Sequence, residues 1–130
     1  MKFTVVIYAA PYSNQAATSA WQFCNALLAA GHGIYRLFFY HDGVHNNNAL
    51  SVPAQDEINL PLEWRKLILA HDIDAVSCVS SALKRGVLDA AEAERHERDC
   101  HNLDASANLS GLGQLIDACI ESDRVICFGA

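Results

Sequence analysis

The sequence is poor in charge and in the residues that break regular structure. Its 130 residues include seven glycines and three prolines, and charged residues make up 18% of the chain. This composition excludes collagen-like, low-complexity and disordered chains. No apolar run approaches the length of about eighteen residues that a membrane-spanning helix needs. The net charge is -6 and no basic run is present, so direct binding of nucleic acid is not expected.

The cysteines show no CxxC motif and no close repeat. They are five in number: Cys24, Cys78, Cys100, Cys119 and Cys127. An odd number without a framework favours reduced thiols in the cytoplasm over the disulfides of a small secreted chain. The apolar run after Lys2 imitates a short signal peptide, but one basic residue and two tyrosines argue against that interpretation. The sequence therefore predicts a cytoplasmic protein.

Apolar runs alternate with helical patterns along the whole chain. Strands are predicted over 3–9, 34–40, 75–79 and 124–128, with a short one within 101–109. Helices are predicted over 15–30, 61–71, 81–86, 90–99 and from Ser110 onward, and 41–60 is a polar connection. Strands that are apolar on both faces indicate a parallel sheet covered on both sides. The predicted fold is α/β, a flavodoxin-like doubly wound sheet of about five mainly parallel strands with helices on both faces, forming one domain over 1–130.

Two helices carry further expectations. Asp89 and Ser110 are predicted to cap the helices that follow them. The last helix is predicted to bury one apolar side: Leu112, Leu115, Ile116, Cys119 and Ile120. No Asp, Glu, Lys or Arg occurs from Phe3 to Tyr35, so helix 15–30 has no charged outer face. A surface helix normally carries such charge, and we therefore expect this helix to contribute to an oligomer interface.

A ligand site is expected beyond the carboxyl ends of the strands, where parallel sheets bind their ligands. Three segments follow strands there: 10–14, 41–44 and 78–81. Cys78 ends a strand just before a helix, and backbone N–H groups at a helix start lower a cysteine pKa. Lys84 and Arg85 would add positive potential. The alternative is that Cys78 is an inert core residue, as many free cysteines are.

The remaining candidates have simpler interpretations. Cys24, Cys119 and Cys127 lie among apolar neighbours and are expected to be core residues. A base near Cys78 could come from His41, Asp42 or His45, although a solvated loop explains them equally well. His96, Cys100 and His101 resemble a partial zinc site, but a zinc site needs at least three ligands in suitable geometry. The first turn contains no glycine and Gly111-Leu-Gly113 lacks a third one, so a phosphate cradle is not indicated.

Several segments resemble the DsrE/TusD family of sulfur-relay proteins. They are Phe38-Phe39-Tyr40-His41-Asp42-Gly43-Val44, Cys78-Val79-Ser80-Ser81-Ala82-Leu83-Lys84-Arg85-Gly86-Val87, Asn108-Leu109-Ser110-Gly111-Leu112-Gly113 and Ser122-Asp123-Arg124-Val125. The resemblance spans the chain in order, and the Cys78 segment is its most specific part.

This resemblance implies a sulfurtransferase that binds sulfane sulfur as a persulfide on Cys78, with no metal or organic cofactor. It implies a heterohexamer with two related small subunits, which are DsrF/DsrH-like or TusC/TusB-like. It also implies an upstream persulfide donor and a small DsrC/TusE-like acceptor protein whose cysteine takes the sulfur. The match favours cytoplasmic sulfur oxidation in the reverse dissimilatory sulfite reductase pathway, with 2-thiolation of tRNA uridine as the alternative. A non-catalytic scaffold subunit and a module binding FMN or a nucleotide remain the competing classes.

Overall fold

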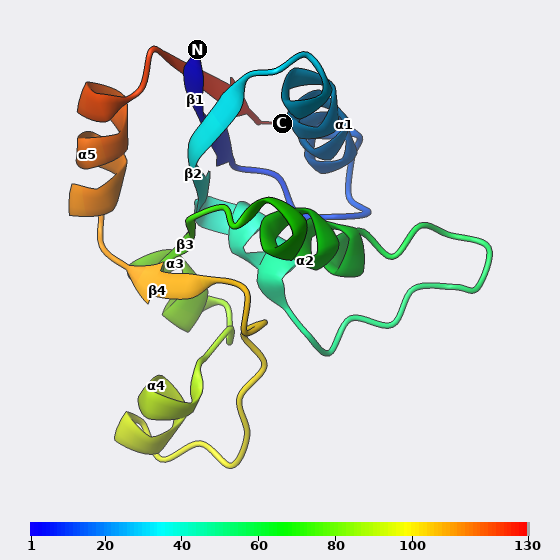
Figure 1. Cartoon of the computed structure of the whole chain (residues 1–130). Helices are drawn as coiled ribbons and strands as arrows, with labels where there is room; N and C mark the ends of the chain where they lie inside the picture. Colours follow the sequence, from blue (N-terminus) through cyan, green and yellow to red (C-terminus); the bar gives the residue numbers. More distant parts are fainter. Residues whose placement is uncertain (130) are drawn as a thin grey trace.

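The computed structural model describes residues 1–129, which form a parallel sheet with helices on both sides (Figure 1). The elements in chain order are β1 (Lys2–Ile7), α1 (Ala16–Ala29), β2 (Gly33–Phe39), η1 (His41–Asn47), α2 (Leu60–His71), β3 (Ala75–Cys78), α3 (Val79–Lys84), α4 (Ala90–Arg95), β4 (Asn108–Ser110), α5 (Gly113–Glu121) and β5 (Arg124–Phe128). The predicted strands and helices are all present, with shifts of a few residues at their ends.

All four strand pairings are parallel, and the strand order is β4-β3-β2-β1-β5. The chain thus moves outward from β1 to β4 and then returns to add β5 on the other side of β1. The predicted α/β doubly wound class is confirmed. The reversal comes after the fourth strand, whereas the flavodoxin order 2-1-3-4-5 reverses after the second.

Helices α1 and α2 cover one face of the sheet (Figure 1). Their apolar sides meet the strands in the larger core cluster, in which Trp64 is fully buried. The indole ring stands edge-on to Phe39 with ring centroids 5.3 Å apart, and its Nε1 donates to Asn46 Oδ1 at 3.1 Å. This face is closed because two helices supply enough apolar surface to cover it.

Helix α5 lies over the opposite face, and its predicted burial is right for Leu115 but wrong for the other four residues. Leu115 packs against the sheet and Ala118 is buried, but three apolar side chains point to solvent: Leu112 (46% exposed), Ile116 (62%) and Ile120 (74%). Cys119 is exposed as well. The apolar spacing predicted the helix correctly. These side chains are exposed because no other element of the described chain lies against the outer side of α5.

An ion-pair cluster around the buried Arg36 holds α5 to the sheet. The Arg36 guanidinium, 8% exposed, lies within 2.7 Å of Asp74 Oδ2 and 3.0 Å of Asp117 Oδ2. Arg36 also donates to the Gln114 carbonyl at 2.8 Å, so it contacts α5 at two points. The hydrogen bonds from Tyr35 and Arg36 lower the pKa of Asp117. Polar contacts therefore contribute to anchoring a helix that buries little apolar surface.

Residues 41–47, predicted as part of a polar connection, form the 3-10 helix η1. Asn46 and Asn47 are buried because the protein satisfies their polar groups: Asn46 donates to the Ala9 and Gly43 carbonyls, and Asn47 accepts from the Ser77 hydroxyl. Gly43 packs directly on the end of β1, where an added Cβ would lie 1.9 Å from the Ile7 carbonyl oxygen. Only glycine fits at this position.

The helix caps are partly as predicted. Asp89 caps α4 by accepting from the Glu92 N–H at 2.8 Å, which confirms the prediction. Ser110 lies in β4 and does not cap α5, whose N-cap residue is Leu112. Among residues 1–129, no helix combines the length and the hydropathy required to span a membrane.

Candidate functional site

Cys78 lies where β3 ends and α3 begins. All four residues of β3 are buried, and Cys78 pairs in register with Ser110 of β4. Cys78 is also the N-cap residue of α3, and its predicted place at the end of a strand just before a helix is confirmed. Only 3% of the residue is exposed, so Cys78 is almost completely buried. It is buried because its side chain packs in the cluster with Val6, Phe38 and Val76.

The exposed part of Cys78 faces a cavity of about 270 Å³, which we call the Cys78 pocket. Its walls come from the ends of β2 and β3, from α3, and from the turn before α5. The residues that line it are Tyr40, His41, Cys78, Val79, Ser80, Ser81, Lys84, Arg85, Gly111 and Leu112. The set contains two cations and no carboxylate, so the lining of the pocket is electropositive.

Arg85 is fixed by contacts on both sides of its guanidinium. Its Nε donates to Asp42 Oδ1 at 2.8 Å, and its Nη1 donates to the Ser81 carbonyl at 3.2 Å. The hydrogen bond from Arg85 lowers the pKa of Asp42. Asp42 is therefore ionised at neutral pH, and it ties η1 to the end of α3.

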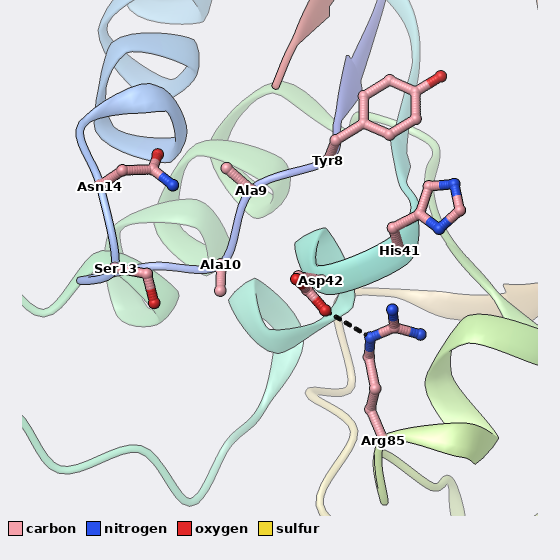
Figure 2. Close-up of a pocket in the computed structure, with 8 residues that line it drawn as sticks. All are labelled: Tyr8, Ala9, Ala10, Ser13, Asn14, His41, Asp42 and Arg85. Carbon is pink, nitrogen blue, oxygen red and sulfur yellow. Dashed lines mark hydrogen bonds and ion pairs between the residues drawn. The ribbon is translucent and has the colours of Figure 1, made fainter. Parts of the chain in front are cut away.

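His41 stands at the border of the Cys78 pocket. Its backbone has φ +48°, a left-handed conformation that is uncommon for a non-glycine residue, and its N–H donates to Ser81 Oγ at 3.1 Å. The imidazole stacks on Tyr40 with centroids 4.1 Å apart and faces Tyr8 at 5.5 Å. Figure 2 shows the ring turned toward Tyr8 and away from the Asp42–Arg85 pair.

The suggested base for Cys78 is assembled only in part. His41 lines the pocket, but the Asp42 carboxylate bonds Arg85 and does not orient the imidazole. His45 does not line the pocket. A Cys–His–carboxylate arrangement is thus not formed in the described chain.

A second cavity, of about 370 Å³, shares lining residues with the Cys78 pocket. Figure 2 shows the residues that line this second cavity. His41 and Arg85 line both cavities. Its outer wall is the turn after β1, including Ala10, Ser13 and Asn14. The three segments predicted to meet beyond the strands therefore do meet, with Gly43 and Val44 buried beneath the surface.

The other cysteines differ in burial, and for two of them the sequence prediction was wrong. Cys24 is buried in the larger core, and desolvation raises its pKa to about 12. Cys119 and Cys127, predicted as core residues, are exposed because the α5 face of the sheet is open. Cys100 is exposed too. His96 contacts Glu92, and within residues 1–129 no three His, Cys, Asp or Glu side chains gather into a metal site.

Sequence reasoning missed several parts of the pocket. Tyr40, Gly111 and Leu112 form its walls, although they lie 38, 33 and 34 residues from Cys78 in the chain. The position of Tyr40 at the end of a strand was a usable signal. The order of the strands, which brings it beside Cys78, was not available from the sequence.

The DsrE/DsrF-like family model matches residues 1–128. The chain is 51% identical over 129 residues to a protein of Pseudomonas aeruginosa named as a sulfurtransferase TusD homolog, covering 99% of this chain and 98% of the relative. It is 44% identical to a protein of Allochromatium vinosum named as the sulfurtransferase DsrE, covering 99% of each. The crystal structure of the ychN protein from E. coli superposes with TM-score 0.78 at 18% identity, over 98% of this chain and 99% of that one, which is a likeness of fold.

Proposed function

Because the chain belongs to the DsrE/DsrF-like family, we propose that it is a sulfur-relay sulfurtransferase that carries sulfane sulfur as a persulfide on Cys78. Sulfurtransferase is the activity in the names of its relatives. The observation that carries the assignment to Cys78 is its pocket. Of the five cysteines, only Cys78 adjoins the cations Lys84 and Arg85 in a cavity without a carboxylate.

The chemistry is thiol exchange, which requires no metal or organic cofactor. The Cys78 thiolate attacks the outer sulfur of a donor persulfide, the donor's S–S bond breaks, and the donor leaves as a thiolate. Cys78 then carries the extra sulfur. An acceptor thiolate attacks that terminal sulfur, and the Cys78 thiolate is the leaving group. One sulfur atom moves in each step with no net oxidation.

The burial of Cys78 shapes how partners must approach. A cysteine that is 3% exposed and lines a pocket of about 270 Å³ is reached by a single side chain and not by a flat protein surface. We therefore expect donor and acceptor to insert their cysteines into the pocket. The side chain that can move aside is that of Lys84, because Arg85 is held by Asp42 and by the Ser81 carbonyl.

Mass spectrometry tests the assignment. The protein is incubated with a limiting amount of a persulfide donor, digested under conditions that preserve persulfides, and mapped for a mass increase of about 32 Da. We expect the added sulfur on Cys78, its absence from Cys78→Ser, and its retention in Cys127→Ser. Cys127 is the matched control because it is exposed and lies outside the pocket. Equal loading of Cys78→Ser and wild type would disprove the role of Cys78.

The outer side of α5 supports the proposal of a hetero-oligomer with two related small subunits. Leu112, Ile116 and Ile120 form an exposed apolar stripe on this helix. Such a stripe is typical of a surface that a partner covers. Helix α1, predicted to contribute to an oligomer interface, exposes polar and small residues and no large hydrophobic side chain. We therefore place the main subunit contact on α5, and the acceptor cysteine at the Cys78 pocket.

Two pathways could use this sulfur relay, namely sulfur oxidation and tRNA thiolation. The sequence segments favour cytoplasmic sulfur oxidation, whereas the 51% identical relative carries the TusD name. The relay chemistry is the same in both branches. Co-expression with the two related subunits in a strain that lacks tRNA 2-thiouridine assigns the branch: restored thiouridine identifies tRNA thiolation, and no restoration despite an intact complex identifies sulfur oxidation.

A further inference from the structure

The two cations of the Cys78 pocket have different surroundings. Arg85 is neutralised by Asp42, at 2.8 Å, and held by the Ser81 carbonyl. Lys84, the last residue of α3, has no carboxylate within 4.0 Å among residues 1–129. Lys84 also lines a neighbouring cavity of about 460 Å³, so its side chain lies at the border of the Cys78 pocket.

The proposed transfer brings two anions together. The reaction is Cys78–S–S⁻ + R–S⁻ → Cys78–S⁻ + R–S–S⁻. The new bond joins the acceptor sulfur to the terminal sulfur, and the electron pair of the broken S–S bond stays on Cys78. Both sides carry two negative charges. A cation beside the terminal sulfur lowers the repulsion during attack and is most effective in a site that excludes water.

We propose that Lys84 is the catalytic cation that contacts the terminal sulfur of the Cys78 persulfide, and that Arg85 is a positioning residue. The inference rests on the proposed function. Arg85 is committed to Asp42, so moving it to the sulfur would cost an ion pair and a hydrogen bond to the Ser81 carbonyl. Lys84 breaks no ion pair of the described chain when it turns inward. Its flexible stem and three N–H donors suit a sulfur that changes bonding partners.

Single-turnover transfer tests the role of Lys84. Each variant is loaded on Cys78 and mixed with glutathione, and loss of the added 32 Da is followed over time. One preorganised anion-stabilising donor contributes about 100- to 1,000-fold. Because Lys84 is exposed, we expect a smaller loss, with Lys84→Gln slower by about tenfold. Lys84→Arg keeps the charge and should stay within about threefold. Lys66→Gln is the matched control, a lysine paired with Glu63 on α2 and outside the pocket, and should transfer at the wild-type rate.

The charge of the acceptor separates a catalytic cation from a structural residue. Cysteamine brings its own ammonium group next to the reacting thiol, which partly replaces a missing Lys84. The loss caused by Lys84→Gln should therefore be smaller with cysteamine than with the anionic glutathione. An equal loss with both thiols would show that Lys84 acts through structure, and would overturn the proposal.

Releasing Arg85 provides an independent test. Asp42→Asn removes the carboxylate that holds Arg85, and the freed guanidinium can then enter the pocket. We expect Asp42→Asn/Lys84→Gln to transfer faster than Lys84→Gln alone. A wild-type rate for Lys84→Gln, or a greater loss for Arg85→Gln than for Lys84→Gln, would contradict the assignment.

Failure of this inference is distinguishable from failure of the proposed function. If the wild-type protein loads Cys78 and Lys84→Gln transfers equally fast, only the role of Lys84 is wrong. If the wild-type protein never carries sulfur on Cys78, both fail.

Discussion

The two faces of the sheet differ in how completely the chain covers them. On one face, α1 and α2 close a core in which Trp64, Leu60 and Phe39 are at most 1% exposed. On the other, α5 lies alone, buries few apolar side chains and leaves its outer stripe in solvent. In the sequence, the apolar residues of α2 and those of α5 recur with the same helical spacing. Apolar spacing therefore identifies a helix face that needs cover, but not whether the cover comes from the same chain.

The largest contrast should appear in the reactivity of cysteines on the two faces. Cys24 lies in the closed core with a pKa of about 12, and Cys127 is exposed on β5. Burial and the nearby Cys119 raise the pKa of Cys127 as well, but its sulfur remains accessible. We expect iodoacetamide at pH 7.5 to alkylate Cys127 more than about 100-fold faster than Cys24. Similar rates under native conditions, measured by peptide mapping, would show that the closed face opens readily.

Removing the ion pairs that anchor α5 should have an effect of intermediate size, on the stability of the fold. Arg36→Met leaves Asp74 and Asp117 without their cation. Breaking a fully buried pair costs about 3–5 kcal/mol, and because these carboxylates are 46% exposed we expect about 2 kcal/mol of lost stability. Urea unfolding measures the loss, and hydrogen exchange should show faster opening of α5 than of α1. Unchanged exchange in α5 would mean that its apolar contacts suffice to hold it.

The smallest effect on the single chain concerns the apolar stripe. Ile116→Asp should change the free energy of unfolding by less than about 0.5 kcal/mol, because the side chain is already 62% exposed. It should nevertheless abolish assembly with the two related subunits, measured by sedimentation velocity of the co-expressed proteins. Leu69→Asp is the matched control, 61% exposed on α2. Loss of assembly in Leu69→Asp instead would place the interface on the closed face.

Much of the candidate site was predictable because the end of a strand is visible in the sequence. Cys78 was correctly placed between a strand and a helix, and the segments around Ala10 and His41 were expected at the same edge. The Asp42–Arg85 pair was not predictable, because it joins residues 43 positions apart through an ion pair that depends on the arrangement of η1 and α3. Residues 41–47 were also misjudged, since buried asparagines such as Asn46 have the same polar composition as a solvated loop.

The sequence by itself determined the alternation of strands and helices, the parallel sheet and the cysteine at the end of β3. These follow from apolar runs and local spacing, which act over a few residues. Tertiary structure alone decided that Cys78 is almost buried and lines a pocket, that Arg85 is committed to Asp42 while Lys84 is not, and that α5 keeps an open apolar side. Those outcomes depend on which elements become neighbours, and packing between distant segments is set by the whole chain at once.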